Sequence, residues 1–319
     1  MKLISGPMAT ISHPAFRILL EKFGGCDEYF TEMINAGTLL TGGQFEKYYL
    51  DPSKEKKKIV WQLTGHDTEH MVEAAKLLNE LPGLGIDLNM GCSAPDIYKF
   101  GAGISWMIKD RSLTQELVHS VRAVVTFPKR FSVKLRLGDD DFTDDEFFSF
   151  CDMLVQEGVE LLSLHPRTKK EKLIRPPRYA YCQSLVERYK NKGIKIYLNG
   201  NVKDEASYNN AIAQAPGVCG VMISRAAVQK PWIFASLKGL HGKVDMKEIA
   251  YDYIADIEKY QPKEFWKTRL QRFFTYYSLN FMFSHYAQTQ FLNASSNEDL
   301  KNRIDDFFAK CPQEQFIIY

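Results

Sequence analysis

The sequence lacks the features that would place it in a membrane or hold it together by covalent cross-links. No run of 18 apolar residues occurs, so we predict no transmembrane helix. The apolar part of the N-terminal stretch is too short for a secretory signal, and we therefore expect a cytoplasmic protein. The six cysteines lie far apart without a C-x-x-C pair, which argues against a disulfide framework and the common zinc and iron–sulfur spacings. We expect five of them, all but Cys92, to be small buried side chains.

Strong positive charge is also missing. The net charge is only +2, so the surface as a whole is too weakly charged to attract nucleic acid. Any RNA partner would have to be attracted by local basic patches. The composition is otherwise that of a globular protein, with 45% apolar and 25% charged residues.

One pattern in the sequence imitates a metal site. The stretch from His66 to His70 reads H-x-x-E-H, an order of residues found in some zinc hydrolases. Asp67 is the expected cap of the following helix, so His66 would precede that helix. The two imidazoles would then not share a helical face, and we expect no bound metal ion.

Short apolar runs recur along residues 1–240, and amphipathic stretches lie between most of them. This alternation predicts an α/β fold, a TIM (β/α)8 barrel. A doubly wound sheet is the alternative, but it seldom needs eight alternating units, and no G-x-G-x-x-G follows the first run. The eight predicted strands are 3–9, 29–33, 59–63, 85–89, 131–137, 161–165, 194–199 and 220–224.

The pattern changes after the barrel. Residues 245–319 are dense in aromatic side chains and predict a small all-helical domain of three or four helices, with Ser296 capping a late one. Most of these aromatics are expected in the core of that domain. A basic cluster there is either an RNA contact or a solvated face. Its members are Lys259, Lys263, Lys267, Arg269 and Arg272.

Polar residues follow every predicted strand at its carboxyl end. In a barrel these ends meet at one mouth, where ligands bind. After the fourth strand stand Asn89 and Cys92, so a side-chain amide and a thiol would lie together at that mouth. Lys134 lies inside an apolar strand, where a charge is costly unless an anion pairs with it.

The segment 85–95, followed by Gly101 and Gly103, resembles the active-site signature of the tRNA-dihydrouridine synthases. These flavoenzymes reduce the C5–C6 double bond of uracil in RNA. The family usually has Pro where this chain has Ser93. Further motifs of the family match along the barrel, at residues 7–9, 31–33, 62, 133–136, 165–168, 199–200 and 220–227.

The resemblance implies FMN bound across the barrel mouth and NADPH as the hydride donor. Hydride would pass from flavin N5 to uracil C6, and Cys92 would be the general acid that protonates C5. The implied cofactor-binding residues are Pro7, Met8, Ala9, Gln62, Lys134, His165, Asn199, Gly200, Asn201, Ser224 and Arg225. The implied substrate-binding residues are Asn89, Arg136, Arg167 and Arg178.

The expected partner is tRNA, bound by a monomer with an FMN-binding domain at 1–240 and a helical RNA-binding domain at 245–319. The stretch 165–178 holds six Lys or Arg residues and one Glu, where the family usually has an aromatic–x–Gly pattern. This departure leaves ribosomal RNA open as an alternative substrate. A small-molecule flavin oxidoreductase of the dihydroorotate or dihydropyrimidine type is the other alternative. Arg136 and Arg167 could contact RNA or form structural ion pairs.

Overall fold

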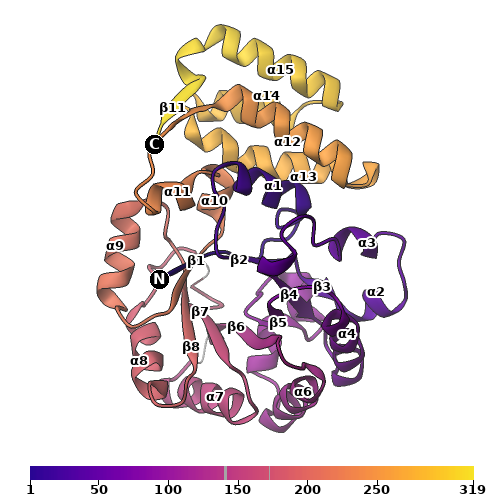
Figure 1. Ribbon diagram of the computed structural model, residues 1–319, viewed down its shortest axis with the longest axis vertical. Coiled ribbons are helices and arrows are strands. Elements are labelled where there is room, and N and C mark those ends of the chain that lie inside the picture. The colour runs from indigo at the N-terminus through magenta and orange to yellow at the C-terminus, as the bar shows by residue number, and fades with distance from the viewer. Residues whose placement is uncertain (140–141, 172) are drawn as a thin grey trace.

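The computed structural model describes residues 1–139, 142–171 and 173–319, and its largest element is a barrel of parallel strands (Figure 1). Strand β2 pairs with both β1 and β4, which closes the sheet, and the short β3 extends β4 at one end. The strands are β1 (Lys2–Ser5), β2 (Glu28–Phe30), β3 (Ile34–Asn35), β4 (Ile59–Thr64), β5 (Gly85–Met90), β6 (Arg130–Gly138), β7 (Leu161–Thr168), β8 (Lys195–Asn199) and β9 (Gly220–Ile223). The predicted TIM barrel is confirmed, and the doubly wound sheet is wrong.

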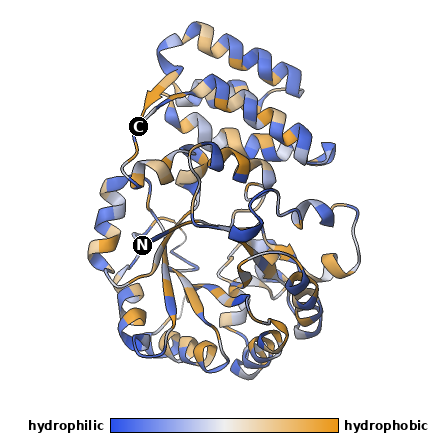
Figure 2. Ribbon diagram, in the orientation of Figure 1, coloured by the Kyte–Doolittle hydropathy of each residue, from blue (hydrophilic) through white to orange (hydrophobic). Residues whose placement is uncertain are grey.

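Helices surround this barrel and cover the outer faces of its strands (Figure 1). Blue and orange mix along these helices in Figure 2, as expected for helices with one face on a core. Several begin at a side-chain cap: Asp67 accepts the His70 N–H at 2.9 Å, as predicted. The helices are α1 (Pro14–Lys22), α2 (Ala36–Leu40), α3 (Glu46–Tyr49), α4 (Thr68–Glu80), α5 (Pro95–Lys99), α6 (Arg111–Val124), α7 (Asp144–Gln156), α8 (Ala180–Tyr189), α9 (Glu205–Gln214), α10 (Arg225–Gln229) and α11 (Ile233–Leu237).

Two predicted strands end at least three residues earlier than expected, and both differences lie at the barrel mouth. The first strand ends at Ser5 because the chain then turns back on itself, where Ser12 Oγ accepts the Met8 N–H at 2.9 Å and donates to the Gly6 carbonyl. The second breaks into β2 and β3, and residues 31–33 lie between them. The motif residues at these places are therefore loop residues.

The C-terminal region is helical, as predicted, and consists of α12 (Met246–Tyr260), α13 (Lys263–Tyr277), α14 (Ser284–Leu292) and α15 (Asn297–Lys310). Its aromatic side chains form a core in which the rings of Tyr253 and Phe273 stack 3.8 Å apart. Ser296 caps α15 as expected. The prediction of an all-helical domain missed an antiparallel ribbon formed by β10 (Lys243–Asp245) and β11 (Phe316–Ile318).

The helical region packs on the barrel through α12 and α13, which contact α1 and α10 respectively (Figure 1). This contact places α13 beside the carboxyl ends of the first and last strands of the barrel. Within the ranges that the structure describes, no helix combines the length and the apolar character needed to cross a membrane.

Candidate active site

A cavity of about 560 Å³ opens at the carboxyl ends of the strands, where active sites of such barrels lie. The loops after β1, β7 and β8, with side chains of β6 and β9 and the start of α10, form most of its wall. It collects the predicted cofactor residues Pro7, Met8, Lys134, His165, Asn199, Gly200, Asn201, Ser224 and Arg225. The remaining two, Ala9 and Gln62, do not line it. Arg272 and Tyr276 of α13 also line it, and sequence reasoning missed their place there.

Lys134 of β6 lies between the apolar residues Val133 and Leu135 and lines this cavity. Its ammonium group makes no hydrogen bond or ion pair with any residue in the part of the chain that the structure describes. Burial, together with the nearby positive charge of Arg136, lowers the pKa of Lys134 to about 8. A buried cation without a partner is costly, so this position is suited to an anionic or electron-rich ligand.

His165 lies beside Lys134 on the neighbouring strand and is only 8% exposed. Burial and the adjacent Arg136 and Lys134 hold its pKa well below the ordinary value, so the imidazole is neutral. Its Nε2 lies 2.8 Å from Nη1 of Arg167. Arginine only donates, so Nε2 is the acceptor and Nδ1 carries the ring proton. His165 therefore offers an N–H donor in the wall of the cavity.

The turn after β8 brings backbone atoms to the edge of the cavity. Gly200 has φ +127°, and a Cβ there would lie 3.0 Å from the His165 ring, so only glycine fits this close approach. The Tyr179 hydroxyl donates to the Gly200 carbonyl at 2.6 Å, and Asn199 Nδ2 donates to the Met222 carbonyl at 2.8 Å. The turn is thus held from both sides.

One end of the cavity is positively charged. Arg225, the first residue of α10, is exposed there and lies 3.4 Å from Asn201. Lys203 and Arg272 line the same cavity. Ser224, Arg225 and Ala226, at the start of α10, line this end, and no side chain caps the helix there. Cations and backbone donors together are suited to a phosphate group.

Cys92 does not line the cavity itself; it lies on the adjoining loop after β5, held by Asn89. Asn89 Oδ1 accepts the N–H groups of Gly91 at 3.2 Å and Cys92 at 2.9 Å. Its Nδ2 donates to Gln62 Oε1 at 2.9 Å. Gln62 is fully buried and donates in turn to Asp87 at 2.8 Å. A chain of hydrogen bonds therefore connects the cysteine loop to the interior of the barrel.

Asp87 is a site residue that sequence reasoning missed. It is fully buried on β5, where it accepts from Gln62 and from the Ser132 hydroxyl at 2.7 Å. Burial raises its pKa to about 6, against the lowering effect of these hydrogen bonds and of Lys134. The signal was present in the sequence, since an acidic residue in the middle of an apolar strand requires partners.

Gly103 allows the cysteine loop to pack closely. It has φ +61°, and a Cβ there would lie 2.5 Å from the Cys92 carbonyl. That carbonyl accepts the Ile104 N–H at 3.0 Å. Any side chain at position 103 would displace the loop that carries the thiol.

The predicted substrate-binding arginines are held by protein groups. Arg136 Nε donates to the Gly91 carbonyl at 3.0 Å, which ties it to the cysteine loop. Arg167 is fully buried against His165 and donates to the Arg175 carbonyl. Arg178 makes a two-pronged ion pair with Glu171, both contacts at 2.9 Å. Of the basic stretch 165–178, Lys172 lies outside the described residues.

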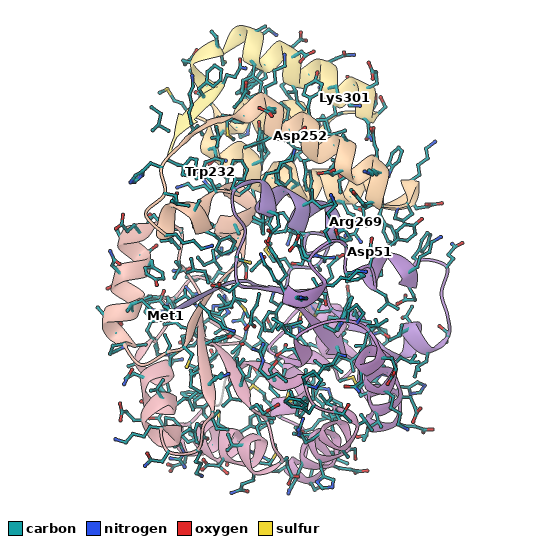
Figure 3. The ribbon with its side chains drawn as sticks, viewed as in Figure 1. Met1, Asp51, Trp232, Asp252, Arg269 and Lys301 are labelled. Carbon is teal, nitrogen blue, oxygen red and sulfur yellow. The ribbon has the colours of Figure 1, made fainter. Side chains whose placement is uncertain are left out.

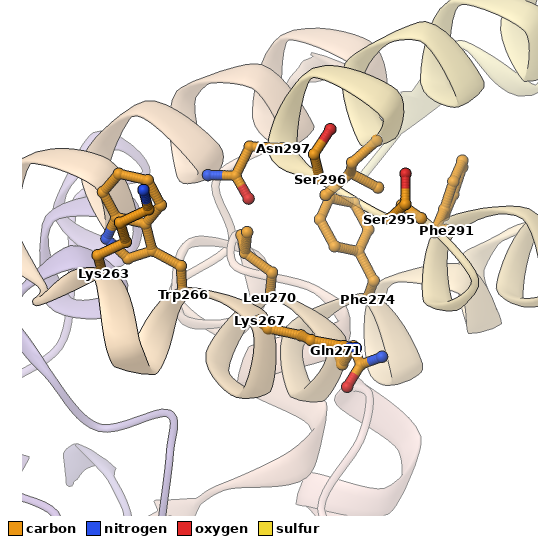
Figure 4. A pocket seen from close by; sticks show the side chains of 12 residues that line it. Lys263, Trp266, Lys267, Leu270, Gln271, Phe274, Phe291, Ser295, Ser296 and Asn297 are labelled. Atoms are coloured by element: carbon orange, nitrogen blue, oxygen red, sulfur yellow. The ribbon is translucent and has the colours of Figure 1, made fainter.

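A second cavity of about 310 Å³ lies within the helical region, between α13 and the start of α15 (Figure 4). Its wall is mostly apolar, with Trp266, Leu270 and Phe274 at its base and Lys263 and Lys267 at its rim. No predicted cofactor or substrate residue lines it. Elsewhere, Cys219 is exposed, so the expectation that it is buried is wrong.

A closed parallel barrel with a polar cavity at its carboxyl end and a cysteine loop beside it defines a TIM-barrel enzyme. Its fold resembles morphinone reductase in complex with tetrahydroNAD, with a TM-score of 0.53 and 12% identity, covering 74% of this chain and 86% of the other. At this identity the likeness concerns the fold.

Sequence comparison defines the family. The family described as "Dihydrouridine synthase" matches residues 3–317. A probable tRNA-dihydrouridine synthase of Aquifex aeolicus is 32% identical over 241 residues, which cover 74% of this chain and 72% of the relative. A probable tRNA-dihydrouridine synthase of Staphylococcus aureus is 25% identical over 320 residues, which cover 98% of this chain and 94% of the relative. The chain belongs to the dihydrouridine synthase family and is a flavin-dependent oxidoreductase.

Proposed function

We propose that this enzyme reduces the C5–C6 double bond of a uridine in the D-loop of tRNA, with FMN as its flavin and NADPH as the reductant. The observation that carries the proposal is the cavity that gathers Lys134, His165 and the turn at Gly200 beside the Cys92 loop. The names of the relatives from Aquifex aeolicus and Staphylococcus aureus support tRNA as the substrate class. A tRNA substrate also agrees with the cytoplasmic location expected from the sequence.

The cavity residues fit FMN. Lys134, a partly buried cation without a protein acceptor in the described ranges, would hold the electron-rich pyrimidine edge of the isoalloxazine, and His165 would donate from Nδ1. At the other end Arg225, Lys203 and the start of α10 would hold the phosphate. Pro7 and Met8 would lie against the ring. Gln62 supports this site through Asp87 and Asn89.

Bound FMN supplies the hydride that adds to uracil C6. Cys92 then gives its thiol proton to C5, and the loop geometry fixed by Asn89 aims the thiol. Cys92 is half-buried, which leaves it open to reprotonation from solvent.

The uracil must leave the RNA stack to reach this position. Asn89 keeps one amide hydrogen beyond the one donated to Gln62, and that hydrogen would meet a uracil carbonyl. Arg136 and Arg178 would interact with phosphates or with the base, whereas Arg167 is fully buried and would act by holding His165. NADPH would reach the flavin before RNA does.

The test is mass-spectrometric mapping of dihydrouridine in tRNA and rRNA from cells with and without the gene. Loss at a tRNA position that the purified FMN-loaded protein restores in vitro would support the proposal. Loss in ribosomal RNA alone would move the substrate to that RNA. If RNA is unchanged and the purified protein instead turns over dihydroorotate or a free dihydropyrimidine, the small-molecule alternative is correct.

A further inference from the structure

A buried ion pair joins the helical region to the barrel. Arg269 of α13 and Glu32, in the loop between β2 and β3, meet at 2.7 Å, and their side chains are 2% and 5% exposed. Figure 3 labels Arg269 where the C-terminal helices meet the N-terminal part of the barrel. The expectation that Arg269 belongs to an RNA-facing or solvated basic cluster is therefore wrong.

The second oxygen of Glu32 reaches the loop that borders the cavity. Glu32 Oε1 accepts the N–H of Thr10 at 2.5 Å. Thr10 has φ +65°, a left-handed conformation that is a genuine outlier for a β-branched residue and must be held by its surroundings. Pro7 and Met8, at the start of the same loop, line the cavity.

The partners of Glu32 show why Arg269 matters to this loop. Within the described ranges the Glu32 side chain forms hydrogen bonds with Arg269 and with the Thr10 N–H. The nearby Arg17 interacts with Glu32 through its charge but donates its hydrogen bonds to the carbonyls of Ser12 and Asp51. A buried carboxylate that loses its cation no longer keeps a fixed charged position. The acceptor that holds Thr10 therefore depends on a residue of the helical region.

Arg269 is itself fixed on α13. Its guanidinium packs over the rings of Phe265 and Tyr49, at 4.9 and 5.7 Å from their centroids. One turn later on the same helix, Arg272 and Tyr276 form part of the cavity wall. The docking of α13 thus shapes the cavity in two ways. Arg272 and Tyr276 contribute to its wall directly, and Arg269 holds the neighbouring loop indirectly through Glu32.

We propose that Arg269 is a positioning residue for the flavin site, which holds the loop at residues 7–10 in place through Glu32. The inference rests on the proposed FMN site. It implies that the flavin site is complete only while the helical region is docked on the barrel. If bound RNA displaced α13, the flavin site would therefore change as well.

The first experiment compares FMN binding by the flavin-free full-length protein and its variants, followed by quenching of flavin fluorescence below the melting temperature of each variant. We expect Arg269→Met to weaken FMN binding roughly tenfold or more, because small displacements of positioning groups are costly. Arg269→Lys keeps the charge and should recover part of the affinity. The control is Lys22→Ala, which removes an exposed ion pair with Asp252 between the same two parts of the protein (Figure 3).

A second variant separates positioning from mere stability. Glycine adopts φ +65° without strain, so Thr10→Gly should leave FMN binding nearly unchanged in the wild-type background. In the Arg269→Met background it should restore part of the lost affinity, because the loop no longer needs to be held against strain. A purely structural role of Arg269 would lower the melting temperature without this rescue.

The outcomes are distinct. If the wild-type protein binds no FMN, the proposed function fails before the inference is reached. If the wild-type protein binds FMN and folded Arg269→Met binds it equally well, the inference is overturned. If Arg269→Met does not fold, Arg269→Lys decides: binding weakened about threefold and rescued by Thr10→Gly supports the inference, and unchanged binding overturns it.

Discussion

The side-chain oxygen of Asn89 lies 2.9 Å from the backbone nitrogen of Cys92, and the same side chain donates to Gln62 at 2.9 Å. One amide therefore connects the loop that carries the thiol to the buried network around Asp87. In this arrangement the position of the thiol is set by the interior of the barrel as much as by its own loop.

Asn89→Ala should lower turnover on RNA about 10- to 100-fold, because the loss of positioning of a reacting group is costly. The substitution leaves two N–H groups and the Gln62 oxygen without their hydrogen-bond partner, so the free energy of unfolding should fall by about 1–3 kcal/mol. FMN affinity should change little. Asn79→Ala, which removes an exposed asparagine bonded to Thr126, is the matched control. Normal turnover of Asn89→Ala would contradict the positioning role.

Cys92→Ala should lower dihydrouridine formation by roughly 10²- to 10⁴-fold, the usual contribution of a general acid. Reduction of the flavin by NADPH, which does not need the proton, should proceed at the wild-type rate in stopped-flow absorbance. Cys219→Ala, the removal of an exposed cysteine, should alter neither step. Full turnover without the Cys92 thiol would exclude it as the proton donor.

Lys134 should make FMN binding depend on pH. Burial lowers its pKa to about 8, below the ordinary value for lysine, so above pH 8 the folded flavin-free protein releases a proton that the unfolded chain keeps. The flavin-free protein should therefore gain stability from this group as pH rises from about 8 toward the ordinary lysine range.

FMN binding should show the opposite dependence, because an anionic ligand favours the charged ammonium. We expect FMN affinity to fall as pH rises above about 8, with proton uptake on binding detected by calorimetry in buffers of different ionisation enthalpy. Lys134→Met should weaken binding at neutral pH and remove this pH dependence. A pH profile that is the same in Lys134→Met and in the wild type would assign the effect to another group.

Gly200→Ala should destabilise the protein by about 1–3 kcal/mol, because φ +127° is a glycine conformation. It should also weaken FMN binding, since the new methyl group would press on His165. Gly193→Ala separates the backbone strain from the contact with His165. Gly193 has φ +71°, and no other group lies within 4 Å of the place that the new methyl group would take. This variant should therefore lower the stability of the protein but leave FMN binding unchanged. Chemical denaturation and FMN titration of both variants measure this difference.

The barrel was predictable because its signal is local and repeated. Each strand is a short apolar run, and several of the helices between strands begin at a side-chain cap such as Asp67. The cavity residues were predictable for the same reason, since the carboxyl ends of parallel strands must meet. Lys134 stood out because a charge inside an apolar strand needs a partner.

The features that could not be predicted from the sequence depend on contacts between residues far apart in the chain. Arg269 was grouped with its basic neighbours because a local charge pattern does not show which cation meets Glu32, 237 residues away. The pairing of β10 with β11 joins two strands of three residues each, too short to give an alternating pattern. Asp87, in contrast, could have been predicted, because an acidic residue in the middle of an apolar strand requires partners.

The β10–β11 ribbon brings the two ends of the C-terminal region together, with Lys243 paired to Ile318. The chain enters this region from α11 through residues 238–242, so an exchange of residues 243–319 between family members would place its junction there. Such an exchange would transplant the whole exposed surface of these helices at once. The donor region would also have to supply an arginine in the place of Arg269, or the recipient's Glu32 would be buried without a cation.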